Sequence, residues 1–133
     1  MSTNSTIAVL ENGKITAVYC HWDGYIENNG EILQNHYDLA KTKQLLAQGS
    51  VSVLGEDIGK KQSFDDYAAN TCVFYGRDRG DDDDDTKAKT FKTKKAMIKW
   101  FDTPFFYLLD AATGEWSASR GETWFNLKNA LER

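Results

Sequence analysis

Apolar, β-branched residues dominate the start of the chain. Residues 6–10 and 14–22 form two apolar, β-branched runs, and Asn12-Gly13 joins them. An Asn-Gly pair accepts the left-handed backbone angles of a two-residue turn, so this pattern predicts an N-terminal β-hairpin.

Helical spacing follows the hairpin. From residue 31 to residue 40 the apolar positions recur every three to four residues, which is typical of a helix with one buried side. Asp38 is suited to capping a second short helix that stops at Gly49. Further helices are predicted over residues 91–101, where the pattern is amphipathic, and over residues 124–131.

The remaining apolar runs predict strands. Residues 71–75 indicate a central strand, and residues 105–110 and 115–119 form a second hairpin-like pair around Thr113-Gly114. Because this order lacks regular βαβ alternation, we expect an α+β fold with a mainly antiparallel sheet covered by three or four short helices. The length of 133 residues and the absence of a long linker predict a single domain over residues 1–133.

Composition narrows the class of protein. With 41% hydrophobic and 13% aromatic residues, the chain is neither disordered nor collagen-like. No apolar run approaches the ~20 residues of a membrane helix, and the first residues lack a signal-peptide pattern. Cys20 and Cys72 lie in apolar runs, which indicates reduced, buried thiols in a cytoplasmic protein without membrane contact.

Charge is distributed unevenly along the chain. The formal net charge is −4, and such a protein is a poor candidate for direct nucleic-acid binding, which depends on neutralising phosphates. Five consecutive aspartates repel one another and cannot enter a core, so we expect an exposed acidic loop at about residues 78–86. These aspartates are Asp81, Asp82, Asp83, Asp84 and Asp85.

The first candidate site lies at the end of the second strand. If that strand stays extended, alternation places one set of polar and aromatic side chains on one face and Val18, Cys20 and Trp22 on the other. The first set consists of Tyr19, His21, Asp23 and Tyr25. Aromatic rings with hydrogen-bonding groups suit a base or adenine-type ligand. A purely structural interpretation, with packed rings and an Asp-Gly turn, remains the alternative.

The second candidate site is the segment Gly76-Arg77-Asp78-Arg79-Gly80. Arg77 and Arg79 could present their guanidinium groups to a phosphate, and the flanking glycines would allow close approach. Alternatively, both arginines simply offset the aspartates that follow. Asn29, before a predicted helix, could add backbone amides for an anion.

Metal and catalytic motifs are weak. The chain has two histidines and no Cys-x-x-Cys pair, and the aspartate run lacks the spaced ligands of a calcium loop, so no metal and no cofactor are expected. No nucleophile elbow occurs, and we assign no catalytic residue. His21 with Asp23 as a general base would support a phosphodiesterase-type hydrolase, which we keep as a third hypothesis after two binding hypotheses.

A longer set of motifs resembles a known family. The segment Tyr-Cys-His-Trp-Asp-Gly-Tyr at residues 19–25, and later Ser-Val-Leu-Gly at 52–55 and Tyr-Gly-Arg-Asp-Arg-Gly at 75–80, are similar to small proteins of phages, prophages and related mobile elements. The resemblance spans roughly residues 7–120 and implies no settled activity. By analogy, small accessory phage proteins often counter host defence in the host cytoplasm, either by trapping a nucleotide signal or by occluding a host protein.

The leading hypothesis is therefore a phage-type accessory protein that binds a small nucleotide-like ligand without turning it over. It requires the strand end and the arginine pair to meet at one hollow. Its ligand-binding residues would be Tyr19, His21, Trp22, Asp23, Tyr25, Asn29, Arg77 and Arg79. The rival is an inhibitor that binds a host defence protein through residues 81–85, because an acidic surface steers association with a basic partner. The sequence leaves open whether the protein is a homo-oligomer.

Overall fold

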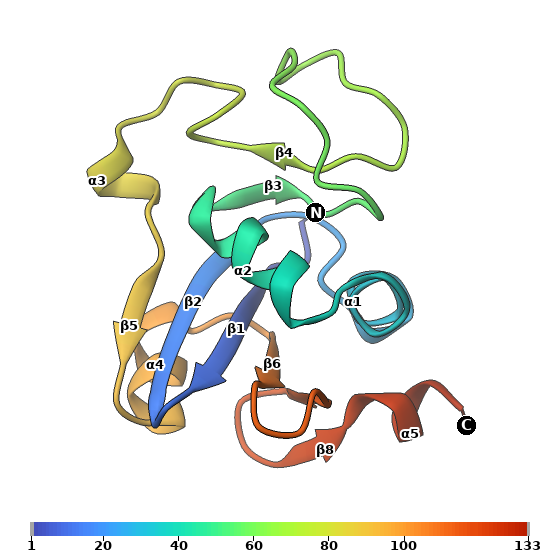
Figure 1. Ribbon diagram of the computed structural model, residues 1–133, viewed down its shortest axis with the longest axis vertical. Coiled ribbons are helices and arrows are strands. Elements are labelled where there is room, and N and C mark those ends of the chain that lie inside the picture. Colours follow the sequence, from blue (N-terminus) through green and yellow to red (C-terminus); the bar gives the residue numbers. More distant parts are fainter. Residues whose placement is uncertain (1, 133) are drawn as a thin grey trace.

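A β-hairpin lies at the centre of the fold. A computed structural model describes residues 2–132, and in it β1 (Ser5–Glu11) pairs with β2 (Lys14–Cys20) (Figure 1). The turn residues Asn12 and Gly13 have φ angles of 55° and 74°, the left-handed values that an Asn-Gly turn accepts. The predicted hairpin is confirmed, although its second strand ends at Cys20.

The hairpin is extended into one mixed sheet. Six further strands are β3 (Val51–Val53), β4 (Val73–Phe74), β5 (Lys89–Phe91), β6 (Phe105–Asp110), β7 (Trp116–Ser119) and β8 (Trp124–Asn126). The strand order is β4-β3-β2-β1-β6-β7-β8, and β5 also pairs with β2. Among the strand pairs of residues 2–132, only β1–β6 and β2–β3 are parallel, so the expected α+β class with a mainly antiparallel sheet is confirmed.

Helices pack on both faces of this sheet. They are a π-helical turn η1 (Ile26–Gly30) and the helices α1 (Glu31–His36), α2 (Leu39–Ala47), α3 (Asp83–Thr86), α4 (Lys94–Phe101) and α5 (Leu127–Leu131). The described residues thus hold more helices than expected, partly because the aspartate run forms the single turn α3 instead of a loop. None of these helices combines the length and apolar character needed to span a bilayer.

Local capping signals explain where two helices begin. The Asp38 carboxylate accepts a hydrogen bond from the Lys41 amide at 2.9 Å, which confirms the predicted cap of α2. Thr93 caps α4 by accepting from the Ala96 amide at 3.1 Å. The predicted helix from residue 91 is therefore wrong in its first turn, because Phe91 pairs with Ile15 in the sheet.

One strand prediction and one helix prediction need correction. The run 71–75, predicted as a central strand, contributes only Val73 and Phe74, and β4 is the last strand in the order of the sheet. Phe74 is nevertheless buried, because its ring belongs to the larger hydrophobic core, and the Arg77 guanidinium lies 4.6 Å from the ring centre. The predicted helix over 124–131 is in fact strand β8 followed by α5.

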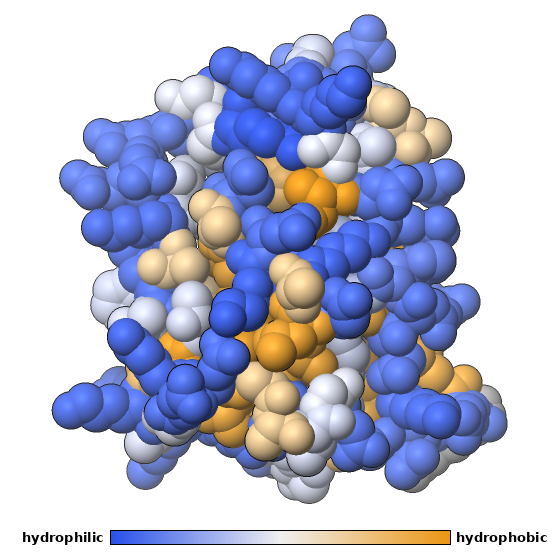
Figure 2. Space-filling view, in the orientation of Figure 1, coloured by the Kyte–Doolittle hydropathy of each residue, from blue (hydrophilic) through white to orange (hydrophobic). Residues whose placement is uncertain are grey.

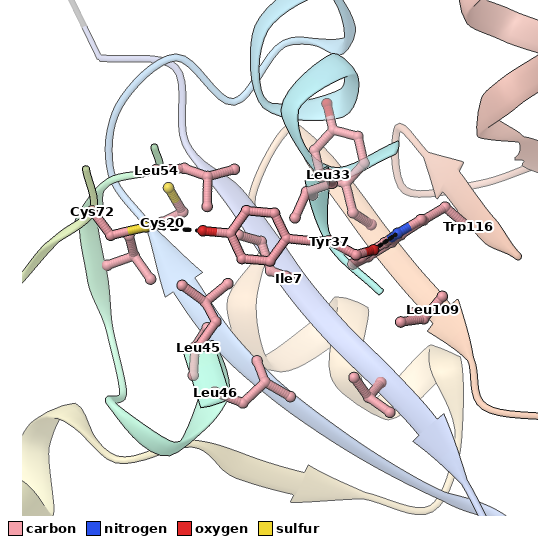
Figure 3. Packing of buried hydrophobic residues seen from close by; sticks show 14 of the residues in the cluster. Ile7, Cys20, Leu33, Tyr37, Leu45, Leu46, Leu54, Cys72, Leu109 and Trp116 are labelled. Atoms are coloured by element: carbon pink, nitrogen blue, oxygen red, sulfur yellow. Dashed lines mark hydrogen bonds between the residues drawn. The ribbon is translucent and has the colours of Figure 1, made fainter. Parts of the chain in front are cut away.

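The larger core lies between the sheet and helices α1 and α2 (Figure 3). Tyr37 crosses it: the hydroxyl donates to the Gly55 carbonyl at 2.8 Å, and the Tyr37 carbonyl accepts from the Trp116 indole at 3.1 Å. Cys20 and Cys72 are buried free thiols in this core, as predicted. A smaller cluster on the opposite face packs α4 against the sheet, and it consists of Ala8, Ile15, Ala17, Met97, Phe106 and Leu108.

Candidate functional site

The first candidate residues lie where β2 ends. Tyr19 and His21 share a face of the chain, as alternation predicts, and the Tyr19 hydroxyl lies 2.6 Å from His21 Nδ1. The Asn4 side chain donates to the His21 carbonyl at 2.7 Å and so ties this end of β2 to the N-terminal segment. The phenol and the imidazole therefore form one hydrogen-bonded unit at the sheet end.

Trp22 lies outside the core and against His21, whereas strand alternation placed the two residues on opposite faces. Its ring packs edge-on against the His21 ring, with 4.7 Å between centroids, and the residue is 41% exposed. Alternation fails because β2 ends at Cys20 and Asp23 takes a left-handed φ of 55°. Gly24 follows with its backbone against the N-terminal segment, where a Cβ would come within 2.7 Å of the Asn4 carbonyl oxygen.

The same break in the strand separates Asp23 and Tyr25 from His21. Asp23 lines a different hollow, of about 370 Å³, together with Glu27, Glu31 and Glu56. No hydrogen bond or ion pair within residues 2–132 links Asp23 to His21. Tyr25 is exposed just before η1 and makes no ring contact with the other candidates among the described residues.

Asn29 has a structural position. Its side chain is buried and donates to the Trp22 carbonyl at 3.2 Å, with Cys20 Sγ at 3.4 Å. The amide thus holds the chain in the bend after β2. It does not face solvent, and a ligand could not reach it without opening this bend.

The arginine pair divides between two environments. Arg77 turns inward: its guanidinium donates to the carbonyls of Ile58, Gly59 and Cys72 and to the Asp78 carboxylate at 2.9–3.1 Å. These contacts occupy four of its five N–H donors, so Arg77 cannot present its fork to a phosphate without giving up contacts inside the fold. Asp78 is also inside, with a fully buried side chain, and the expectation that it belongs to an exposed loop is wrong.

Asp78 stays ionised despite its burial. Burial by itself raises the pKa of the carboxyl group. The Arg77 guanidinium and the amides of Phe74 and Gln62 outweigh that effect, and the pKa of Asp78 is lower than its ordinary value. The charged form is therefore part of the folded structure.

Arg79 turns outward and reaches the aromatic residues. Its guanidinium lies 4.6 Å from the Tyr75 ring centre and 5.1 Å from that of Phe64. It is also paired through two hydrogen bonds, of 2.8 and 2.6 Å, with the Asp81 carboxylate. The Tyr75 ring in turn lies 6.5 Å from His21.

These contacts define a continuous surface, which we call the aromatic patch: Tyr19, His21, Trp22, Phe64, Tyr75 and Arg79. Sequence reasoning missed Tyr75 and Phe64 as members. Tyr75 could have been found, because it follows buried Phe74 and alternation turns it to the other side. Phe64 lies in a long connection without any periodic signal.

The phenols of the patch are neutral at physiological pH. Burial, followed by the neighbouring Tyr75 phenol, raises the pKa of Tyr19 to about 12. Burial also raises the pKa of Tyr75. Both hydroxyls keep their protons and can act as hydrogen-bond donors.

Tyr19 also borders a hollow of about 380 Å³. Trp100 and Phe101 of α4 form its aromatic wall, and Lys87 and Lys89 line it as well. Trp100 is 63% exposed, the highest value among the large hydrophobic residues that the structure describes as exposed. The patch therefore continues into open, partly aromatic space.

The aspartate run borders the same region. Asp81 is held by Arg79, and Asp82 caps α3 by accepting from the Asp84 amide at 3.0 Å. Asp83, Asp84 and Asp85 are exposed, and only Asp84 has an ion-pair partner among the described residues, Lys87 at 3.6 Å.

Comparison with protein-family models, with curated proteins and with solved structures gives no match for this chain. The aromatic patch is accordingly interpreted from its own geometry. Its aromatic rings, neutral hydroxyl donors and single surface guanidinium have the chemistry to contact a planar ligand that carries negative charge.

Proposed function

We propose that this protein binds a small nucleotide-like ligand on the aromatic patch and does not turn it over. The observation that carries the proposal is the contact series from Trp22 through His21 and Tyr75 to the Arg79 guanidinium. It places stacking surfaces and a cation on one side of the molecule. A base would stack on the rings, and a phosphate would replace the Asp81 carboxylate as the partner of Arg79.

Exchange of partners at Arg79 suits a reversible site. The Arg79–Asp81 pair lies at the surface, where an ion pair of this kind contributes little to stability. Asp81 therefore keeps the guanidinium oriented in the free protein at small cost. An incoming phosphate offers the same two-oxygen geometry with more charge, so it can displace the carboxylate.

Binding without turnover agrees with the chemistry of the nearby nucleophiles. Burial raises the pKa of the Cys20 thiol to about 12 and also raises that of Cys72, so neither supplies a thiolate. The hydrolase hypothesis needs Asp23 beside His21, but Asp23 lines another hollow and Tyr19 is the partner of the imidazole. In a phage-type accessory protein, such a site would sequester a nucleotide signal of the host.

Calorimetry against a panel of mononucleotides and short oligonucleotides tests the proposal. We expect Arg79→Gln to weaken binding of phosphorylated ligands by about tenfold or more, because it removes a charge-assisted contact. Trp22→Ala should weaken binding by a similar factor of about ten through loss of stacking.

Arg120→Gln is the matched control, because Arg120 is also exposed but packs over Phe105 and Phe125, outside the aromatic patch. Equal affinities for Arg79→Gln, Trp22→Ala and wild type, or no heat with any nucleotide, would contradict the proposal. Mass spectrometry of the ligand after incubation separates binding from hydrolysis, since binding returns the ligand unchanged.

A second candidate function rests on the aspartate run. Asp83 and Asp85 are exposed and have no ion-pair partner among residues 2–132, so their charges are available to a basic surface of a host protein. Replacing Asp83, Asp84 and Asp85 by asparagine should slow association with such a partner in a salt-dependent way. The same variant should bind nucleotides with unchanged affinity if the aromatic patch is the functional site.

A further inference from the structure

The turn end of the β1–β2 hairpin carries a hollow that is separate from the aromatic patch. Its volume is about 430 Å³, within the range of small-molecule sites. The hairpin turn lies beyond α2 in Figure 1, so the helix covers only part of the strands on this face. Figure 2, in the same orientation, shows apolar surface exposed below the position of α2 and framed by polar groups.

The floor of this hollow is apolar and already formed. Val9 and Thr16 are a cross-strand pair of β1 and β2, and both line the hollow. Leu46 and Ala47 line it from α2, and Ala88 lines it from the segment before β5. Val9 and Leu46 belong to the larger core, which holds the floor in place. A ligand would therefore bind without a loss of conformational entropy from ordering these side chains.

The mouth of the hollow carries an excess of positive charge. Glu11 lies opposite Lys14 in the hairpin register, and the Lys43 ammonium of α2 reaches the Glu11 carboxylate at 2.8 Å. Lys43, Leu46 and Ala47 share one face of α2, at the spacing of one helical turn. Two lysines therefore meet one carboxylate at the mouth, and no carboxylate of the described residues forms an ion pair with Lys14.

We infer that this hollow is a binding site for a compact apolar molecule with a single negative charge, such as an aryl or acyl carboxylate or sulfonate. The apolar body would lie on Val9, Leu46, Ala47 and Ala88. The anionic group would face Lys14 and Lys43, where one cation is not neutralised. The hollow is lined by both charged and apolar residues, and contact with both kinds would orient the ligand.

The test uses two fluorescent probes with the same apolar body. Anilinonaphthalene sulfonate carries the negative charge, and neutral phenylnaphthylamine lacks it. We expect saturable fluorescence enhancement with the sulfonate, and shifts of the Val9 and Leu46 methyl signals in NMR spectra. Ala47→Trp, at an exposed helix position, should fill the hollow and abolish binding of both probes.

Lys14→Gln should weaken binding of the sulfonate about fivefold and leave the neutral probe unaffected, as loss of one exposed charge predicts. Lys95→Gln is the control, because Lys95 is an exposed residue of α4, which packs on the opposite face of the sheet. Absence of binding, methyl shifts away from the hollow, full binding by Ala47→Trp, or equal weakening of both probes by Lys14→Gln would each overturn the inference. The methyl shifts of the wild type decide the location even if Ala47→Trp fails to fold.

Discussion

The Arg77–Asp78 pair is expected to be essential for stability. We consider Arg77→Met, which keeps an apolar stem over the Phe74 ring and removes the guanidinium. In the folded protein the Arg77 side chain is 11% exposed and that of Asp78 is fully buried. The substitution leaves the Asp78 carboxylate inside the protein with only the amides of Phe74 and Gln62 as partners.

The size of the effect follows from this burial. Removing one partner of a buried ion pair costs about 3–5 kcal/mol, because the remaining charge is not compensated. The loop carbonyls of Ile58 and Gly59 lose the Arg77 donor at the same time, whereas the Cys72 carbonyl keeps the Gln62 side-chain amide as a donor. The free energy of unfolding of a small domain is about 5–15 kcal/mol in total, so the variant should be only marginally stable.

The pH dependence has a definite sign. In the wild type the folded-state pKa of Asp78 is lowered, so the carboxylate stabilises the fold above its ordinary pKa of 3.8. This stabilisation is lost as the pH falls from that value through the lower folded-state pKa. In Arg77→Met burial is no longer offset by the guanidinium, so protonation of Asp78 becomes favourable. The difference in stability between the two proteins should therefore shrink as the pH falls from 7 toward 4.

Urea denaturation followed by far-UV circular dichroism measures both effects. We expect the midpoint of Arg77→Met to fall by about 2 M at neutral pH, from the stated energy and a typical slope. Arg79→Met is the control, since the Arg79 side chain is half exposed and should be replaceable with little change. Equal midpoints for the two variants, or a stability difference that grows on acidification, would refute the reasoning.

Three further predictions follow from close packing: two concern residues of the core, and one concerns the contact between the backbones of Gly49 and Thr86. Cys20 and Cys72 should not react with a disulfide reagent in the native protein, because burial raises the pKa of both thiols. Both should react once the protein is unfolded in urea. If either thiol of the folded protein reacts as fast as an exposed cysteine, the prediction is wrong. Tyr37→Phe should lower the free energy of unfolding by about 1 kcal/mol through loss of the hydroxyl hydrogen bond, measured in the same urea titration, and an unchanged midpoint would argue that the bond contributes nothing. Gly49→Ala should lower the free energy of unfolding by about 2 kcal/mol or more, because Gly49 has a φ of 84° and a Cβ would lie 2.4 Å from the Thr86 carbonyl oxygen. A thermal melt measures the effect, and a melting temperature equal to that of the wild type would exclude this clash.

Several features of the fold could be predicted because their causes are local. The hairpin follows from alternation and from Asn12-Gly13, and the start of α2 follows from the Asp38 cap. Each of these signals lies within a few residues of the structure that it specifies. The parallel pairing of β1 with β6 has no such signal, because the two strands are separated by most of the chain.

The candidate site was predicted less completely, since side-chain direction depends on long-range packing. Trp22 and Asp23 leave the predicted faces because the chain turns at Gly24 against the N-terminal segment. Tyr75 and Phe64 join the patch because Arg79 stacks on both rings. Nothing in the local pattern of residues 60–80 indicates that the Arg79 guanidinium contacts both the Phe64 and the Tyr75 ring.

Residue type and order alone were enough to establish the α+β class, the N-terminal hairpin, the buried thiols and an arginine pair next to acidic residues. They could not separate Arg77 from Arg79, which are two positions apart and chemically identical. The folded chain separates them, because the carbonyls of the 58–59 loop surround the first guanidinium while the second meets the exposed ring of Tyr75. One arginine thus stabilises the fold and the other remains at the surface, since burial of a cation depends on acceptors that distant parts of the chain supply.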